Sequence, residues 1–349
     1  MPPTFETLLE TWTGESVLIH RDRPTGTWVF IALYSTRPGT PMGGTRMRVY
    51  DRPADGLRDA LRLAEGMAYK WACLGLEKGG GKAVLAVPEP MRGKARRDLL
   101  LRYGKLVESL GGAFATGEDL GTTPADMAVL HEVTRYVHGI REDGRVTDPG
   151  PFTANGVAHG IRSVVTEVLD RRDLEGLRVA VQGLGDVGEP LVRILHRKGA
   201  DLTLADVEVD RAEDLARELG AASVPAAEIY CADCDVFAPC AVGGILNPST
   251  IPQLRCRIVA GSANNQLEVP DRDSLHLRDR GIVYVPDFVI NAGGALVFGT
   301  MTGTDGPEEL MAKTEAIGFT VREILREARE REETPLEAAF RRAERVLRD

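Results

Sequence analysis

The chain has 349 residues, of which 43% are hydrophobic and 27% charged, a composition typical of soluble globular proteins. Its net charge of -9 and the lack of a dense basic run argue against a nucleic-acid-binding protein. No apolar run approaches the roughly 18 residues that a membrane-spanning helix needs, and the length favours two domains.

The first residues, MPPTFETLLETW, are acidic and lack an apolar segment, so we expect no secretory signal. Five cysteines, an odd number, favour free thiols in a reducing compartment. A zinc site at Cys231, Cys234 and Cys240 is not favoured, because no histidine or fourth cysteine lies close by in the sequence. We therefore expect a cytoplasmic protein without a metal.

The first fifty residues predict a helix followed by strands. FETLLETW has helical spacing, whereas SVLIHRD and TWVFIALYST are β-branched and aromatic runs separated by a turn signal at residues 24–26. In the next segment, PMGGTRMRVY, Gly43 and Gly44 follow the apolar Met42. Paired glycines indicate a close approach to the backbone.

Two lysines bracket the segment MAYKWACLGLEKGGGK, residues 67–82. The apolar spacing before it predicts an amphipathic helix that carries Lys70 at its end. Lys82 follows three consecutive glycines, which predict a turn that a ligand can approach closely, before a short strand AVLAVP. Two ammonium groups in one half-buried pocket would leave one of them neutral near pH 7, and a neutral amine is a base. The alternative is a glycine-rich surface loop with solvated lysines.

Residues 94–110 predict a helix that ends at a glycine pair. In the following FATGEDLGTTPADM, a strand is expected to end near Thr116 and a helix to begin at Pro124. Glu118 and Asp119 are thus expected in a loop between strand and helix, where catalytic groups are common. Either is explained equally well as a solvated acid.

The polar segment 139–151, which contains glycine and proline, predicts a domain boundary. We expect a first domain at 1–150 and a second at 151–330. A last helix, about 331–349, begins with a capping box and is a candidate to pack back on the first domain.

Residues 178–210 predict a strand, a glycine turn, a helix and a second strand. The turn has the spacing G-x-G-x-x-G, and Asp206 ends the second strand 23 positions after Gly183. In this dinucleotide-binding pattern the helix N-terminus faces the pyrophosphate and the acid accepts the ribose 2′-OH. Because Asp206 would repel a 2′-phosphate, NAD is favoured over NADP. The expected contacts in the turn are Gly183, Leu184, Gly185, Asp186, Val187 and Gly188.

Strands and helices continue to alternate through DVFAPC, RIVAGSAN and GIVYVPDFVIN, as a parallel sheet requires. The turns that follow these strands begin at Cys240, Asn264 and Asn291. Parallel sheets bind ligands at the carboxyl ends of their strands, so we expect the cofactor and substrate there.

Seven segments resemble, in order, the leucine, valine and phenylalanine dehydrogenases of the glutamate dehydrogenase superfamily, and leucine dehydrogenase most closely. They are MGGTRM, GMAYKWACLGLEKGGGKAV, TGEDLGTTPADM, VAVQGLGDVG, DVFAPCAVGG, AGSANNQL and PDFVINAGG. The resemblance implies an α/β fold in which a substrate-binding and oligomerisation domain is separated by a cleft from a Rossmann-type NAD domain. It also implies a homo-oligomer that reversibly deaminates an L-amino acid to a 2-oxo acid and ammonia with NAD. The tail after Gly299 matches poorly.

The resemblance implies roles for individual residues. Lys70 is similar to the lysine that holds the substrate carboxylate, and Lys82 to the catalytic lysine that activates the water attacking the imine. Asp119 is similar to the acid that exchanges protons with the substrate nitrogen. Further positions resemble residues near the nicotinamide and substrate, Asn264, Asn265 and Asn291, and cofactor contacts, Thr153, Cys240 and Ala241.

Four positions bear on the substrate. Glutamate enzymes of this family have a lysine where this chain has Met42, before Gly43 and Gly44, so an acidic substrate would lack a partner in an apolar pocket. Gly117, where leucine enzymes have alanine, and the small Ala295 indicate a roomier pocket, which Phe298 is placed to refill. We expect branched-chain amino acids, with phenylalanine or tryptophan as the alternative.

Two other functions remain open at this point. One is a catalytically silent relative that binds amino acid and NAD as a sensor. The other is a Rossmann enzyme acting on a 2-hydroxy acid, which lacks the expected catalytic histidine because His159 and His196 fall on predicted helices.

Overall fold

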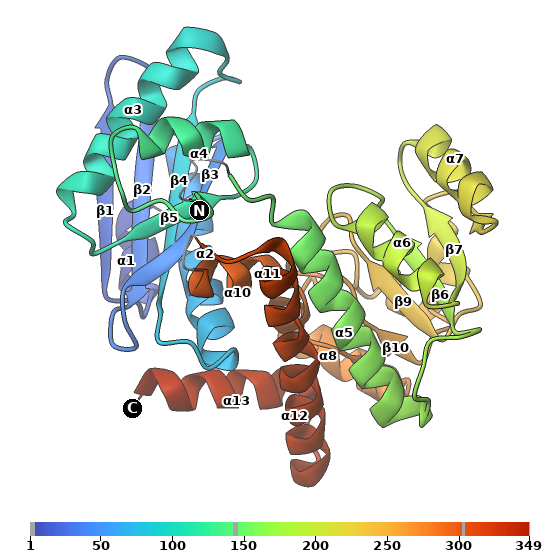
Figure 1. Cartoon of the computed structure of the whole chain (residues 1–349). Coiled ribbons are helices and arrows are strands. Elements are labelled where there is room, and N and C mark those ends of the chain that lie inside the picture. Colours follow the sequence, from blue (N-terminus) through green and yellow to red (C-terminus); the bar gives the residue numbers. More distant parts are fainter. Residues whose placement is uncertain (1–3, 142–145, 302–303, 349) are drawn as a thin grey trace. The chain divides into compact units, whose positions relative to one another are not determined.

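The computed structural model describes residues 4–141, 146–301 and 304–348, which fold into two compact units (Figure 1). Part of the expected linker, 142–145, lies outside the described residues. The domain limits expected from the sequence stay a prediction, because compact packing does not show which part folds alone. The first unit comprises Met1–Asp148, Phe298–Asp305 and Ala343–Asp349, and the second comprises Pro149–Val297 and Gly306–Arg342.

A five-stranded sheet forms the centre of the first unit. Its strands are β1 (Ser16–Asp22), β2 (Thr27–Ser35), β3 (Pro41–Val49), β4 (Gly79–Val87) and β5 (Ala115–Glu118). They lie in the order β1-β2-β4-β3-β5; β3 is parallel to both of its neighbours, and the β1–β2 and β2–β4 pairs are antiparallel. The helices are α1 (Phe5–Thr11), α2 (Pro53–Cys73), α3 (Gly93–Ser109) and α4 (Pro124–His131).

Helices cover both faces of this sheet, which explains why β2 is apolar at nearly every position. Val29 and Ile31 pack in one hydrophobic cluster with residues of α3 and α4. Phe30 and Ala32, on the opposite face, pack in another cluster with α2 and α1. Because helices cover both faces, we expect the functional groups at the ends of the strands and among the buried polar side chains.

The three glycines before Lys82 lie within β4, so the prediction of a turn there was wrong. Every residue of β4 is buried. A side chain at Gly80 would come within 2.5 Å of Ala68 Cβ in α2, and one at Gly81 within 2.9 Å of the Phe114 ring. These glycines are thus required by close packing. Because glycine suits both tight turns and close packing, the sequence alone did not distinguish them.

The second unit contains a six-stranded parallel sheet. Its strands are β6 (Arg178–Gln182), β7 (Asp201–Ala205), β8 (Ala222–Ser223), β9 (Val236–Pro239), β10 (Ile258–Val259) and β11 (Val283–Tyr284). They lie in the order β11-β10-β9-β6-β7-β8. The order reverses between β6 and β9, which is the Rossmann arrangement, and ligands bind at such a reversal.

The remaining helices precede, alternate with or follow the strands of this sheet in sequence, and two of them, α10 and α13, contribute residues to both units. They are α5 (Gly150–Leu169), α6 (Gly188–Arg197), α7 (Val209–Leu219), α8 (Pro270–Asp279), α9 (Asp287–Ile290), α10 (Gly293–Thr300), α11 (Pro307–Lys313), α12 (Glu315–Arg331) and α13 (Pro335–Arg348), with short 3₁₀ turns η1 (Ile229–Cys231) and η2 (Ile251–Gln253). None of the described helices is long and apolar enough to cross a membrane.

Several expected elements are confirmed. The strand, glycine turn, helix and strand from residue 178 appear as β6, α6 and β7, and Asp206 directly follows β7. Helix α4 begins at Pro124, and Thr334 and Glu337 form the capping box of α13. Both units are α/β, as the sequence predicted. Strand β5 continues through Glu118, so that residue is not in the loop where it was expected.

Candidate active site

An ion pair joins the buried Lys82 to the half-buried Asp119 in the first unit. Lys82 lies in the middle of β4, its side chain is 5% exposed, and its Nζ donates to Asp119 Oδ1 at 2.6 Å. Asp119 directly follows β5, and β3 separates β4 from β5 in the sheet. The structure thus brings together the two residues expected to be catalytic, which lie 37 positions apart in the sequence.

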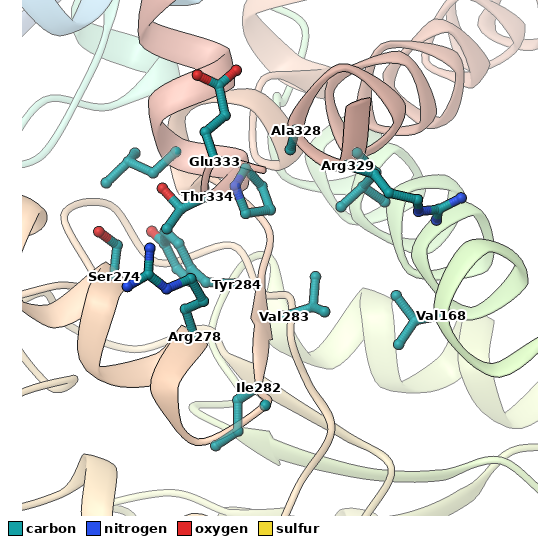
Figure 2. Close-up of a pocket in the computed structure, with 14 residues that line it drawn as sticks. Val168, Ser274, Arg278, Ile282, Val283, Tyr284, Ala328, Arg329, Glu333 and Thr334 are labelled. Atoms are coloured by element: carbon teal, nitrogen blue, oxygen red, sulfur yellow. The ribbon is translucent and has the colours of Figure 1, made fainter. Parts of the chain in front are cut away.

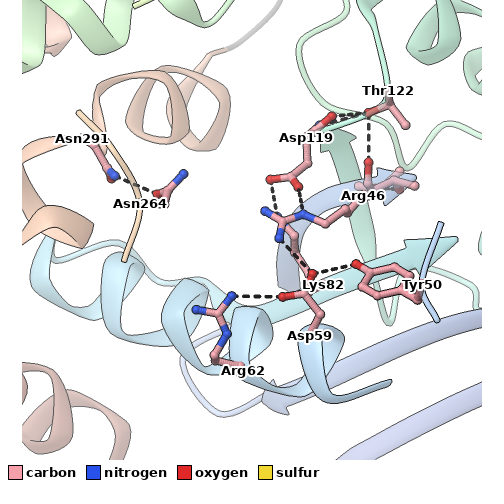
Figure 3. A network of polar contacts seen from close by, with 11 residues as sticks. Arg46, Tyr50, Asp59, Arg62, Lys82, Asp119, Thr122, Asn264 and Asn291 are labelled. Carbon is pink, nitrogen blue, oxygen red and sulfur yellow. Dashed lines mark hydrogen bonds and ion pairs between the residues drawn. The ribbon is translucent and has the colours of Figure 1, made fainter. Parts of the chain in front are cut away.

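A second cation, Arg46 of β3, contacts the same carboxylate (Figure 3). Its Nε donates to Asp119 Oδ2 at 2.7 Å, and its Nη1 donates to Asp59 Oδ2 at 2.9 Å. The backbone N–H of Asp119 donates to Thr122 Oγ1 at 3.0 Å. Both carboxylate oxygens of Asp119 therefore have a charged donor, and its main chain is also held.

Burial and charge act in opposite directions on this pair. Burial lowers the pKa of the Lys82 ammonium; Asp119 raises it, and the nearby Arg46 charge lowers it again, so that the net direction is downward. Burial alone raises the pKa of Asp119, but Lys82 and Arg46 outweigh it and hold this pKa well below its usual range. Asp119 is therefore ionised, and Lys82 loses its proton more readily than a solvated lysine.

The last two turns of α2 lie against the glycines of β3 and β4. A side chain at Gly43 would come within 3.1 Å of Met67 Cγ and would also meet the carbonyl oxygen of Gly81. A side chain at Gly44 would come within 2.5 Å of the carbonyl oxygen of Glu118. The close approach expected at both glycines therefore involves neighbouring parts of the chain.

Lys70 and Met42 flank this packing. Lys70 lies in the last turn of α2 and is half-buried. Met42 is buried, and its carbonyl oxygen accepts a hydrogen bond of 2.9 Å from Trp71 Nε1. That both Lys70 and Lys82 face one substrate stays a prediction.

Gly117 and Phe298 lie next to each other. A side chain at Gly117 would have Phe298 Cδ2 and His138 O as its nearest neighbours, both at 4.0 Å. The Phe298 ring also packs on Gly139, where an added Cβ would be 3.1 Å from Phe298 Cζ. Phe298 therefore occupies space next to the position that Gly117 leaves open.

The glycine turn of the second unit has the conformation that its sequence predicted. Gly183 has φ +91°, and its N–H donates to Ala205 O at 2.8 Å. A side chain at Gly188 would meet the carbonyl oxygen of Gly183. At Gly185, no described heavy atom beyond its chain neighbours lies within 4 Å of an added Cβ. The open space at Gly185, at the N-terminus of α6, suits a pyrophosphate, so the residues present fit a dinucleotide.

Asp206 holds this turn from the end of β7. Its Oδ2 accepts from Leu184 N–H at 2.7 Å and its Oδ1 from Glu208 N–H at 2.9 Å, and its side chain is buried. Arg211 Nη1 lies 3.8 Å from Asp206 Oδ2. Asp186 is exposed and Val187 half-buried. An arginine so placed is a feature that in related folds accommodates a 2′-phosphate, and the sequence prediction did not consider it.

The other expected substrate and cofactor positions of the second unit lie in turns after its strands, in α5 and in α10. Asn291 Nδ2 donates to Asn264 Oδ1 at 2.7 Å (Figure 3), and Asn265 has a left-handed backbone with φ +53°. Cys240 follows β9, its N–H donates to Gln182 O at 2.7 Å, and burial raises the pKa of its thiol. Ala241 lies against Gly183, Thr153 Oγ1 accepts from Gly294 N–H at 3.2 Å, and Ala295 is half-buried in α10.

A cavity of about 280 Å³ lies elsewhere in the second unit, among α8, β11, α12 and the start of α13 (Figure 2). Its lining includes Ile282 and Val283, where the chain enters β11. Because the sheet is parallel, this is the edge opposite the glycine turn, so the cavity lies away from the expected cofactor site. Among the described residues no group of three or more His, Cys, Asp or Glu side chains is placed to hold a metal ion.

Comparison with known proteins identifies the family. The model of the Glu/Leu/Phe/Val dehydrogenase dimerisation domain matches residues 21–136, and that of glutamate/leucine/phenylalanine/valine dehydrogenase matches 205–331. A leucine dehydrogenase of Geobacillus stearothermophilus is 41% identical over 90% of this chain and 86% of its own length. The chain belongs to the Glu/Leu/Phe/Val dehydrogenase family. This membership confirms the expectation of an amino acid dehydrogenase, an oxidoreductase that uses a nicotinamide dinucleotide.

A second relative within the family is similar at the same level. The L-tryptophan dehydrogenase of Nostoc punctiforme is 43% identical over 97% of this chain and 95% of its own length. A crystal structure of L-tryptophan dehydrogenase from the same organism has a TM-score of 0.83 at 40% identity and covers 99% of this chain and 98% of that one. Family membership therefore does not by itself select the amino acid.

Two charged residues of the site were missed by sequence reasoning. Arg46 stands in the MGGTRM segment that carried the resemblance, and Asp59 lies in α2, yet neither was assigned a role. A signal was available for Arg46, because an arginine two positions after Gly44 in a buried strand must have a partner for its charge.

Proposed function

We propose that this enzyme catalyses the NAD-dependent, reversible oxidative deamination of apolar L-amino acids, with branched-chain amino acids preferred. The observation that carries the proposal is the contact of 2.6 Å between Nζ of the buried Lys82 and Oδ1 of the half-buried Asp119. It supplies an amine and a carboxylate that can exchange protons, in a chain whose second sheet has the Rossmann order.

Each residue has a defined task in this proposal. Lys70 binds the substrate α-carboxylate, Lys82 in its neutral form removes a proton from the water that attacks the imine carbon, and Asp119 exchanges protons with the departing nitrogen. Bound NAD supplies the acceptor for the hydride that leaves Cα. The overall change consumes amino acid, NAD⁺ and water, and produces 2-oxo acid, ammonium, NADH and a proton.

The preference for branched-chain substrates rests on Met42, Gly117 and Phe298. Buried Met42 offers no charge to an acidic side chain, and an unpaired buried carboxylate is penalised by several kcal/mol. The space left by Gly117 borders the Phe298 ring, which supports a pocket for a compact side chain. The alternative is an aromatic substrate, which the similarity to L-tryptophan dehydrogenase favours.

NAD is proposed over NADP because of Asp206. Its buried carboxylate at the end of β7 suits a ribose hydroxyl and repels a phosphate. Arg211, 3.8 Å away, favours the opposite choice.

A homo-oligomer assembled through the first unit is also part of the proposal. The family model that matches residues 21–136 is described as a dimerisation domain. In addition β1 is an edge strand of its sheet, and an unpaired edge is a natural place for a second copy to add.

The test is the initial rate of NADH or NADPH formation with L-leucine, L-valine, L-isoleucine, L-phenylalanine, L-tryptophan and L-glutamate at alkaline pH. We expect the highest kcat/KM with a branched-chain substrate and NAD, and none with glutamate. A higher value for phenylalanine or tryptophan would overturn the substrate preference, and a higher value with NADP the cofactor preference. Binding of NAD and amino acid without turnover of any substrate would show a sensor in place of an enzyme.

A further inference from the structure

Two roles are possible for Arg46. In a structural role it joins α2 to the loop after β5, and in a positioning role it acts on the Lys82–Asp119 pair. The Arg46 side chain is 11% exposed and contacts two carboxylates, one on the loop after β5 and one in α2. A purely structural cross-link requires only that both contacts exist. The geometry around each carboxylate decides between the two roles.

At Asp119 the two cations bind different oxygens of the carboxylate. Lys82 Nζ contacts Oδ1 at 2.6 Å, and Arg46 Nε contacts Oδ2 at 2.7 Å. With one oxygen bound by a planar guanidinium, the carboxylate cannot rotate freely, and the other oxygen stays directed at Lys82. Arg46 thereby determines where the Asp119 oxygen meets the amine.

At Asp59 the guanidinium is itself held in place. Tyr50 Oη donates to Asp59 Oδ2 at 2.7 Å, and Arg62 Nη2 donates to Asp59 Oδ1 at 3.0 Å (Figure 3). Burial alone raises the pKa of Asp59, but Tyr50, Arg46 and Arg62 hold it below its usual value, so Asp59 is ionised. An ionised, fully bonded partner fixes the position of Arg46.

We propose that Arg46 is a positioning residue for the Lys82–Asp119 pair, which directs the Asp119 carboxylate toward Lys82 while sharing its negative charge. This inference rests on the proposed function, in which Lys82 acts as a base. The charged groups that act on Lys82 come from three elements: Asp119 after β5, Arg46 of β3 and Asp59 of α2. Without Arg46, two carboxylates would face Lys82 alone, and the amine would keep its proton to higher pH.

The test is the pH dependence of kcat/KM in the Arg46→Gln variant. Oxidative deamination requires neutral Lys82, so activity rises with pH through the pKa of Lys82. Removing the positive charge raises this pKa, and we expect the acid limb to move to higher pH by about 1 unit. The kcat at the plateau should fall by roughly ten- to a hundredfold, because Asp119 loses its fixed orientation.

Two further variants separate positioning from folding. Arg46→Lys keeps the charge but loses the planar two-sided contact, so kcat should fall while the acid limb stays in place. Arg102→Gln is the matched control, because Arg102 forms contacts of 2.6 and 2.9 Å with the buried Asp22 in the same unit. Arg102→Gln should lower the melting temperature without shifting the acid limb of the pH profile of kcat/KM. If Arg46→Gln behaves like Arg102→Gln, Arg46 is structural and the proposal is wrong.

A measurement that needs no turnover distinguishes this proposal from the proposed function. Competitive acylation of lysines at a series of pH values, read by peptide mass spectrometry, reports the pKa of Lys82 directly. We expect it to be higher in Arg46→Gln than in the unaltered chain. An unchanged value would overturn the role of Arg46 even if the enzyme is active, and a raised value would support it even if the substrate assignment fails.

Discussion

The glycines at 79–81 in the first unit and those at 183, 185 and 188 in the second share little beyond composition. The former are extended and buried within β4, and side chains there would overlap α2, Phe114 and neighbouring backbone. In the latter, Gly183 has positive φ and Gly185 borders open space. The glycines of β4 let protein pack on protein, whereas Gly185 borders space for the proposed ligand, so substitutions at Gly80 and at Gly185 should have different effects.

The largest effect is expected at Lys82, which directly follows the crowded glycines 79–81 in β4. Lys82→Met should lower kcat by roughly 10²- to 10⁴-fold, because the reaction loses its base. Asp119 keeps its contact with Arg46, so the melting temperature should change little. Steady-state rates and thermal unfolding measure both. Lys78→Met is the matched control, because Lys78 is a half-buried lysine directly before β4 that has no assigned role in catalysis. Equal losses of kcat in the two variants would show that Lys82 is not the base.

The next effect is on stability, at Gly80. A Cβ there would lie 2.6 Å from Ala68 N and would also meet the carbonyl oxygen of Ala64. Because these are backbone atoms of α2, the helix must move, and Gly80→Ala should cost about 1–3 kcal/mol, seen as a lower melting temperature. Gly185→Ala, the same change in open space, should leave the melting temperature unchanged. Equal melting temperatures of the two variants would show that Gly80 is no more crowded than Gly185.

The smallest effect is on cofactor affinity, at Gly185. A valine there would fill the space proposed for the pyrophosphate, so the Kd for NAD should rise about tenfold, or 1.4 kcal/mol. The melting temperature without NAD should not change. Isothermal titration calorimetry measures the Kd, and Gly66→Val, another glycine with open surroundings, is the control that should bind NAD normally. Normal binding by Gly185→Val would place the pyrophosphate elsewhere.

The second unit was more predictable from sequence than the first. Its glycine turn, the helix after it and Asp206 are linked within about thirty residues, so local spacing was sufficient to predict β6, α6 and β7. The candidate catalytic site of the first unit depends on contacts between residues that are distant in the sequence. Arg46 is 73 residues from Asp119 and 13 from Asp59, and no local pattern reports such pairings. The glycines before Lys82 were assigned to a turn for the same reason, because the atoms that crowd them come from α2 and from Phe114.

The carboxylate of Asp206 combines two tasks. It is proposed to select the ribose, and it also accepts the N–H of Leu184 within the glycine turn. An engineer who replaces it to admit a phosphorylated cofactor would therefore remove a hydrogen bond to the main chain of the loop that is proposed to bind the dinucleotide. Redesign of cofactor choice is better begun at the exposed Arg211, whose guanidinium can be altered without disturbing that loop.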